Sequence, residues 1–222
     1  MGEGKLSEEL IIAAGGNFNT LRDKVRLNLE GIPKVEGSGA DSLYIAPETK
    51  KVFKNNNYES RTDYYYLNAN DRQNYLFNSK IKGIEESDLI ILIGTNPRFE
   101  ATILNARIRK AYVKNKTEIF SFNNVGDLTY PYKLINGDTE TIKNISEDNH
   151  ELSEKIKKAN KPLIIFGQSY LLLKSSVYTL ELLKSFLLKN NKISNEWNAL
   201  NLISNDASTV GSIDLGIYNN KN

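Results

Sequence analysis

Cysteine is absent from this sequence of 222 residues, and histidine, methionine and tryptophan each occur once. Without a thiol, the chain by itself cannot form a disulfide, a thiolate nucleophile, a cysteine zinc site or a cysteine-held iron–sulfur cluster. The single histidine, His150, leaves a Ser-His-Asp triad or a histidine-rich metal site with one candidate residue. Several kinds of catalytic and redox chemistry are therefore excluded within this chain.

Long apolar runs are also absent. The runs at 89–93 and 163–166 fall far short of the ~20 residues that a membrane-spanning helix needs, so no transmembrane segment is expected. Residues 1–10 show neither the apolar core of a signal peptide nor the Arg-rich, acid-poor composition of a transit peptide.

The overall composition, with 40% hydrophobic and 25% charged residues and a formal charge of +2, is typical of a globular protein. The densest basic cluster, 155–158, stands beside Glu151 and Glu154, which indicates a solvated helix face. Neither the net charge nor its distribution predicts a nucleic-acid partner.

The first 70 residues carry the weakest pattern. Residues 9–30 are typical of a strand, a glycine turn and a helix. The polar stretch 31–70 contains one expected short strand at 42–45, and a connection of this length is usually functional or interface-forming. Its tyrosines fit either a protein interface or packing onto the chain's own core: Tyr58, Tyr64, Tyr65 and Tyr66.

Regular periodicity begins at residue 71. Three apolar runs predict buried strands at 89–93, 118–122 and 163–166. Helices are expected at 71–80, 97–113, 139–145, 149–160 and 196–205, and around the spaced residues Leu173, Val177, Leu180, Leu183 and Leu187. This alternation predicts an α/β fold with a doubly wound, mostly parallel, Rossmann-like sheet at 71–218, preceded by a 1–70 unit and followed by a 219–222 tail.

The helix expected at 97–113 has an amphipathic pattern. Phe99, Ile103 and Ala106 share one stripe, whereas the basic residues Arg107, Arg109 and Lys110 lie largely elsewhere.

The most site-like feature is the turn that follows the 89–93 strand. Asn96 is placed to cap the next helix, and Pro97 suits its first position. Such a turn presents N–H groups to an anion, and Arg98 could clamp a phosphate. The same strand–turn–helix geometry also forms the ordinary corners of doubly wound folds, so both a binding and a purely structural role stay open.

Other catalytic motifs are incomplete. No GxGxxG or GxxxxGK[ST] motif follows a strand, since neither 15–16 nor 37–39 continues correctly. Ser169 lacks the final glycine of a nucleophile elbow, because Leu171 stands at that position. The acidic pairs 85–86 and 147–148 fit helix starts better than catalysis, and His150 fits the surface better.

Several motifs occur in order along the chain: NYLFN at 74–78, IEESD at 84–88, GTNPRFEA at 94–101, LNARIRK at 104–110, DLTY at 127–130, WNALN at 197–201 and VGSIDLG at 210–216. This series resembles the large iron–sulfur subunit of respiratory complex I, the NADH–ubiquinone oxidoreductase, in its molybdopterin-oxidoreductase-like portion. The resemblance spans 61–218, and the GTNPR and NARIRK blocks are its most specific part.

The resemblance implies a partial, split or truncated domain that has lost its pterin and metal. Gly94, Thr95, Asn96 and Arg98 would then be relics of a nucleotide cradle. The family's cysteine-bearing, ferredoxin-like part is missing from this sequence, so the iron–sulfur clusters would lie in a partner chain. The implied location is peripheral, on the matrix side of the mitochondrial inner membrane, among other complex I subunits.

Three functions stay open at this stage. The leading hypothesis is a non-catalytic structural fragment of the matrix arm of complex I, part of the NADH:ubiquinone reductase (H+-translocating). The alternative is a pterin- or nucleotide-binding oxidoreductase module that uses the 94–98 turn. The third is a free-standing small-molecule-binding module with a complete sheet.

Overall fold

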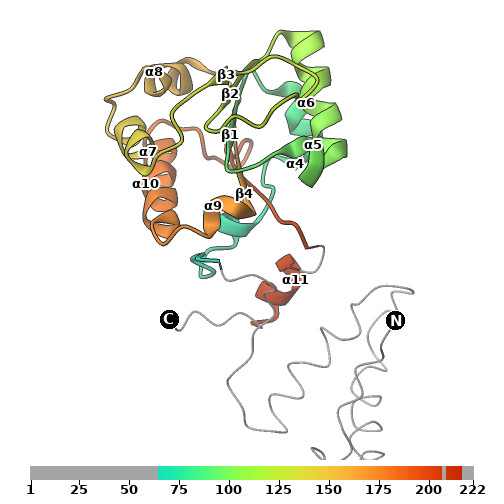
Figure 1. Cartoon of the computed structure of the whole chain (residues 1–222). Helices are drawn as coiled ribbons and strands as arrows, with labels where there is room; N and C mark the ends of the chain where they lie inside the picture. The colour runs from blue at the N-terminus through green and yellow to red at the C-terminus, as the bar shows by residue number, and fades with distance from the viewer. Residues whose placement is uncertain (1–64, 207–208, 217–222) are drawn as a thin grey trace, which may run out of the picture. The chain divides into compact units, whose positions relative to one another are not determined.

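The computed structural model describes residues 65–206 and 209–216 (Figure 1). The chain divides into two compact units, residues 61–210 and residues 1–60 together with 211–222. The elements predicted at 9–30 and 42–45, and the roles of Tyr58 and Tyr64, lie outside the described residues.

In the described residues, five parallel strands form one sheet in the order β3-β2-β1-β4-β5. The strands are β1 (Leu89–Ile93), β2 (Glu118–Ser121), β3 (Lys133–Leu134), β4 (Pro162–Gly167) and β5 (Leu200–Ile203). The chain runs outward from β1 to β3 and then returns to β4 on the other side of β1, which is the order of a doubly wound fold. The predicted α/β class with a mostly parallel, Rossmann-like sheet is confirmed.

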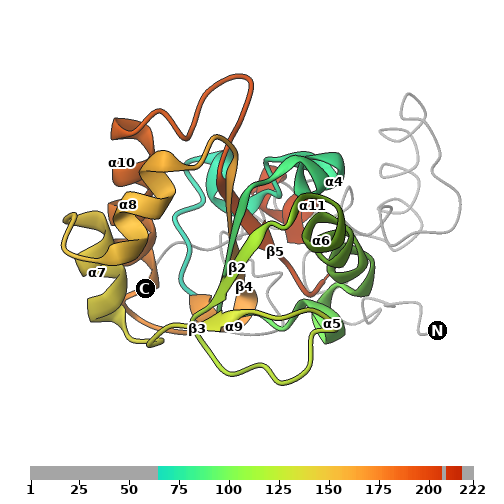
Figure 2. The same cartoon turned by 90° about the horizontal axis from the view of Figure 1, so that it is seen from above.

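Helices cover both faces of the sheet. The helices of the described residues are η1 (Arg72–Tyr75), α4 (Lys80–Gly83), η2 (Ile84–Glu86), α5 (Pro97–Glu100), α6 (Thr102–Asn115), α7 (Thr139–Ser146), α8 (Glu151–Lys158), α9 (Gln168–Leu171), α10 (Ser176–Lys189) and α11 (Thr209–Asp214), the last of which lies mostly in the other unit. Figures 1 and 2 show α4 and α6 on one side of the sheet and α7, α8 and α10 on the other. None of the described helices is both long and apolar enough to cross a membrane.

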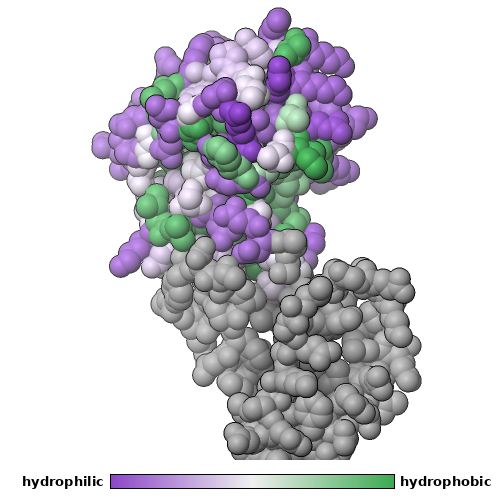
Figure 3. Space-filling model, turned by 45° about the vertical axis from the view of Figure 1, so that its right-hand side comes forward, coloured by the Kyte–Doolittle hydropathy of each residue, from purple (hydrophilic) through white to green (hydrophobic). Residues whose placement is uncertain are grey.

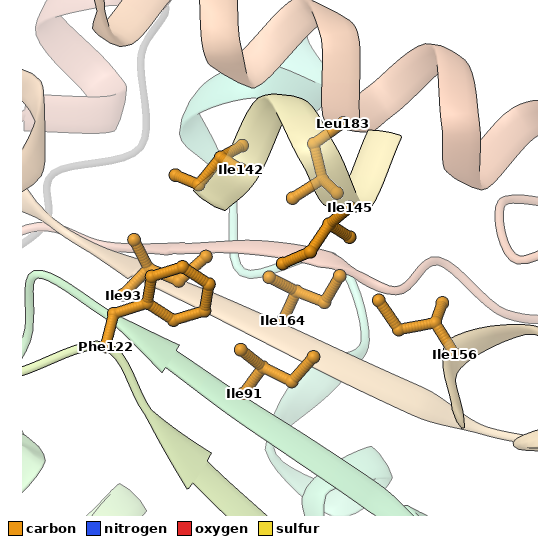
Figure 4. Close-up of a pocket in the computed structure, with 8 residues that line it drawn as sticks. All are labelled: Ile91, Ile93, Phe122, Ile142, Ile145, Ile156, Ile164 and Leu183. Atoms are coloured by element: carbon orange, nitrogen blue, oxygen red, sulfur yellow. The ribbon is translucent and has the colours of Figure 1, made fainter. Parts of the chain in front are cut away.

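The core lies on both faces of β1, whose five residues are all buried. Ile90 and Leu92 belong to the cluster that contains Ile108 of α6. The alternate residues, Ile91 and Ile93, point to the opposite side, toward α7, α8 and α10 (Figure 4). The eight apolar side chains drawn there leave a cavity of about 10 Å³, which is at the lower limit for one water molecule.

Local signals predicted several elements correctly. The strands at 89–93, 118–122 and 163–166 match β1, β2 and β4 within a few residues, and the helix at 139–145 matches α7. Asp138 caps α7, because its Oδ1 accepts a hydrogen bond from Thr141 N over 2.7 Å. The long amphipathic helix corresponds to α10, which buries Leu180, Leu183 and Leu187.

Two predicted helices are wrong. At 71–80 the chain forms only the 3-10 turn η1, followed by an isolated antiparallel bridge from Phe77 to Asn201. At 196–205 it forms strand β5, in which all four residues are buried. From the sequence, Asn201 is expected to be a polar residue of a helix. In the structure its amide is buried: Oδ1 accepts a hydrogen bond from Ser79 N over 2.8 Å, and Nδ2 donates to Ser79 Oγ over 3.0 Å. This tertiary pairing makes the asparagine compatible with a buried strand.

The helix predicted at 97–113 is interrupted at Ala101, whose φ of −151° and ψ of 69° separate α5 from α6. The buried residues of α6 are Asn105, Ile108 and Ala111. The apolar stripe 99, 103 and 106 of the sequence therefore faces solvent rather than the sheet.

The first described residues pack on the same unit. Tyr65 is buried and Tyr66 is half-buried, and Tyr66 N donates a hydrogen bond to Leu171 O over 2.8 Å. For these two tyrosines the structure favours packing onto the chain's own core.

Candidate functional site

The carboxyl ends of β1 and β4 lie next to each other at the point where the strand order reverses. Ligands of doubly wound folds bind in the crevice outside this point. The turn after β1 contains the candidate residues Gly94, Thr95, Asn96 and Arg98, and β4 leads directly into α9.

Asn96 caps α5 as its position predicts. Its Oδ1 accepts a hydrogen bond from Arg98 N over 3.2 Å, and Pro97 occupies the first helical position. The N–H groups of Phe99 and Glu100 both donate to Asn96 O over 3.0 Å. The N–H groups of this first turn are therefore used within the turn itself.

The Glu100 carboxylate occupies the place that a bound anion would take. Its Oε1 accepts from Asn96 N over 2.9 Å, and its Oε2 accepts from Thr95 Oγ1 over 2.8 Å. A carboxylate at a helix N-terminus is favoured by the helix dipole, as a phosphate would be. The turn thus supplies its own anion.

The guanidinium of Arg98 forms hydrogen bonds within the chain and is not left available for a ligand. Its Nη1 donates to Asp127 Oδ2 and to Asp127 O, both over 2.7 Å. The backbone N–H of Thr129 and the guanidinium of Arg98 hold the pKa of Asp127 below its usual range. Asn96 Nδ2 donates to Val125 O over 3.0 Å. Val125 and Asp127 both lie on the loop between β2 and β3, so both bonds join the turn to that loop.

The two loops at the switch point are in direct contact. Gly94 has a φ of +59°, and a Cβ there would lie 2.6 Å from Tyr170 Cβ. A Cβ on Gly167 would lie 2.1 Å from Gly94 O. Ser169 Oγ also donates a hydrogen bond to Gly94 O. Protein atoms of these two loops therefore occupy the switch point, where ligands of doubly wound folds bind.

This arrangement does not fit a phosphate-bearing cofactor such as molybdopterin. The first-turn donors are occupied, the Glu100 carboxylate would repel a phosphate, and adjacent loops close the crevice. Sequence reasoning missed Glu100 and Asp127. Glu100 stands one residue beyond the spacing of a capping box, which is a weak signal, and Asp127 has no local signal because it lies on a separate loop.

The acidic pairs found in the sequence form ion pairs. Glu85 contacts Arg107 and Lys110 of α6. The hydrogen bond from Lys110, followed by the one from Arg107, holds the pKa of Glu85 below its usual range. Glu86 pairs with Lys161 over 2.6 Å. These contacts join α6 and the residue that precedes β4 to η2, which is a structural role.

The second acidic pair and the histidine stabilise the ends of α7 and α8. Asp148 pairs with Lys157 over 2.7 Å, and His150 Nδ1 accepts from Leu152 N over 3.1 Å as the N-cap of α8. Within the part of the chain that the structure describes, no group of three or more histidine, aspartate or glutamate residues could hold a metal ion.

An open groove of about 320 Å³ lies between α4 and the loop before β5. Trp197 and Gly83 line it, and all its other lining residues are polar or charged, among them Lys80, Lys82 and Lys161. Small-molecule sites are mostly apolar with a few polar groups. This groove has the opposite composition.

The sequence profile of the molybdopterin oxidoreductase family, described as "Molybdopterin oxidoreductase", matches residues 34–222. The chain is 36% identical over 183 residues to the NADH-ubiquinone oxidoreductase 75 kDa subunit of Reclinomonas americana, an alignment that covers 82% of this chain and 26% of that protein. It is 40% identical over 146 residues to the mitochondrial 78 kDa subunit of the same enzyme from Candida albicans, with 65% of this chain and 20% of that protein aligned.

A third relative, an NADH-quinone oxidoreductase subunit from Rickettsia prowazekii, is 29% identical over 202 residues, which cover 90% of this chain and 30% of that protein. The chain thus spans between a fifth and a third of the length of these relatives. The resemblance predicted from the motifs is confirmed. Because the family profile covers most of its residues, the chain belongs to the molybdopterin oxidoreductase family.

Proposed function

We propose that the chain is a non-catalytic structural part of the large iron–sulfur subunit of mitochondrial complex I, where it supports electron transfer from NADH to ubiquinone. The observation that carries this proposal is the closed switch point, in which Glu100 occupies the anion position and Gly94 packs against Tyr170. The relatives named NADH-ubiquinone oxidoreductase subunits support the assignment to this enzyme.

Electron transfer needs a redox centre. The chain has no cysteine with which to hold an iron–sulfur cluster, and we place the clusters in a partner chain. The role left to this domain is to pack against the cluster-bearing part of the subunit. Through that packing it would hold neighbouring subunits in position without carrying electrons.

We place the chain peripherally on the matrix side of the mitochondrial inner membrane. Two relatives from eukaryotes carry the names of ubiquinone-reducing subunits, and one of these is described as mitochondrial. Attachment through other subunits would suffice, since association with a large complex needs no membrane span of its own.

Native gel electrophoresis of organelles that contain an epitope-tagged full chain tests the proposal. The tag should comigrate with NADH dehydrogenase activity and be lost from that band when complex I is dissociated. Recovery of the tagged chain from the organelles only as a free monomer, separate from every respiratory subunit, would overturn the proposal.

Native mass spectrometry of the same material tests the absence of a cofactor. The chain should carry no pterin and no nucleotide. A stoichiometric pterin or nucleotide would contradict the non-catalytic assignment and favour an oxidoreductase module that uses the 94–98 turn.

A further inference from the structure

The helix α6 carries apolar residues on two opposite faces. Its inner face buries Ile108 completely against the sheet. On the outer face, Ile103 is 71% exposed and Val113 is 59% exposed, and Phe99 of the preceding α5 is 80% exposed. Ala106 is also exposed between them. We call these four residues the outer stripe.

A surface helix of a monomer normally has one apolar face, and a helix that is apolar on two faces is usually buried on both. Contiguous exposed apolar groups with a polar rim are typical of protein interfaces. Figure 3 turns the side of the molecule that carries α5 and α6 toward the viewer, and green apolar patches lie there among purple polar residues.

Along α6 the charged residues beside the outer stripe are all basic, whereas Glu100 of α5 stands next to Phe99. Residues 102–116 contain five basic side chains and no acidic one: Arg107, Arg109, Lys110, Lys114 and Lys116. The carboxylate of Glu85 compensates part of this charge through Arg107 and Lys110. Arg109 and Lys114 remain exposed on the outer side.

We propose that the outer stripe is a docking surface for another subunit of complex I, one that presents an apolar patch surrounded by carboxylates. This inference rests on the proposed function and adds the face of contact and the chemistry of the partner. Phe99 and Ile103 would be the buried anchors, and the basic rim would pair with aspartates and glutamates.

The charge of the rim also selects among possible occupants. A second copy of this chain, placed symmetrically on the outer stripe, would bring the exposed Arg109 and Lys114 of both copies together. Like charges that face each other across an interface disfavour the contact. An acidic partner has no such repulsion and gains in association rate from the opposite charge.

The test compares two double variants of the full chain in organelles that hold complex I. Phe99→Ser with Ile103→Ser removes the two anchors. Tyr178→Ser with Leu188→Ser removes two residues of α10 that are 61% and 50% exposed, and is the matched control. We expect the fraction of the anchor variant that comigrates with complex I to be at least about tenfold lower than that of the wild type. The fraction of the control variant should change little.

The outcomes separate this inference from the proposed function. If the wild-type chain fails to comigrate, the proposed function is wrong and the docking surface falls with it. If the wild type comigrates and the anchor variant does so equally, only the docking surface is wrong. Urea unfolding of both purified variants should match the wild type, which shows that any loss of assembly is not a loss of folding.

A photocrosslinker introduced at position 99 identifies the occupant. We expect crosslinks to a peptide of a different subunit that contains several aspartates or glutamates, and few crosslinks from the same group at position 178. Crosslinks to a second copy of this chain would overturn the proposal. Binding of the chain to vesicles rich in phosphatidylserine, lost in the anchor variant, would overturn it in favour of a lipid surface.

Discussion

At the scale of single residues, the 94–98 turn satisfies its own polar groups. Glu100 accepts hydrogen bonds from the groups that would bind an anion, and Arg98 is held by Asp127. Gly94 adds a steric requirement, because the left-handed backbone and the contact with Tyr170 both disfavour any side chain. The turn therefore works as a packed corner between β1 and α9.

Gly94→Ala tests this packing. Gly94 and Gly126 both have positive φ, +59° and +73°, so alanine costs about 1–2 kcal/mol in backbone strain at either position. Only at Gly94 does the new Cβ meet another residue, which adds about 1–3 kcal/mol. Urea denaturation should therefore show a larger loss of unfolding free energy for Gly94→Ala than for Gly126→Ala. Equal losses would mean that the loops are not tightly packed.

A second residue-scale prediction concerns Asn105, a polar side chain on the buried face of α6. Its Oδ1 accepts from the Tyr130 hydroxyl over 2.7 Å, and its Nδ2 donates to Leu128 O over 3.1 Å. Burial raises the pKa of the Tyr130 hydroxyl, which keeps it a donor. Asn105→Leu leaves two buried groups without a partner, so we expect a loss of about 2–3 kcal/mol in unfolding free energy.

A double-mutant cycle with Tyr130→Phe isolates this hydrogen bond. Asn105→Leu should cost less in the Tyr130→Phe background, because the unsatisfied hydroxyl is then absent. Strictly additive losses would show that the two side chains do not interact.

At the scale of elements, α6 is the helix whose role differs most from its sequence pattern. Periodicity alone places 99, 103 and 106 on one apolar stripe, yet the opposite side packs on β1 and β2. Asn105 explains the difference, since its partners Tyr130 and Leu128 lie on the loop after β2. With this amide satisfied, the face that contains Ile108 and Ala111 becomes the better one to bury.

Two isoleucines of α6 test this orientation. Ile108→Ala removes a fully buried side chain and should lower the unfolding free energy by about 2–5 kcal/mol. Ile103→Ala changes a residue that is mostly exposed and should stay within about 0.5 kcal/mol of the wild type. The reverse ranking in thermal or urea unfolding would place the other face of α6 on the sheet.

At the scale of the whole molecule, one carboxylate joins three segments that are distant in sequence. Glu118 of β2 pairs with Lys133 of the edge strand β3 over 2.5 Å and with Lys155 of α8 over 2.9 Å. Both lysine Nζ atoms also lie over the Phe120 ring, at 5.4 and 5.3 Å. The cluster fastens the two-residue strand β3, which has little hydrogen bonding of its own, to the sheet and the helical layer.

The pH dependence of stability follows from this cluster. Hydrogen bonds from Lys133 and then Lys155 hold the pKa of Glu118 below its usual range. The stabilisation is thus present above the ordinary glutamate pKa of about 4.3 and is lost as the pH falls through the lower folded-state pKa. We expect Glu118→Gln to be less stable than the wild type at pH 7 and to approach it as the pH falls below about 4.3.

Unfolding free energies measured across this pH range check the prediction. Glu196→Gln removes one carboxylate from an exposed loop position and controls for the change in net charge. A difference between Glu118→Gln and the wild type that stays constant with pH would show that the ion pairs do not contribute.

Much of the architecture could be predicted because its signals are local. The continuous apolar run 89–93 is typical of a buried central strand, and Asn96 caps the helix that begins next to it. The candidate turn was found for the same reason, since Gly94, Asn96 and Pro97 act within a few residues of one another.

The sequence by itself thus determined the α/β class, the central strand, the Asn96 cap and the exclusion of a cysteine-held cluster. Only the tertiary structure decided that 200–203 is a fifth strand, which face of α6 is buried, and that Glu100 and Asp127 fill the candidate site. The physical reason is the location of the partners. A cap or an apolar run acts within one turn or strand, whereas the buried asparagines and Arg98 are satisfied by groups that come from other parts of the chain.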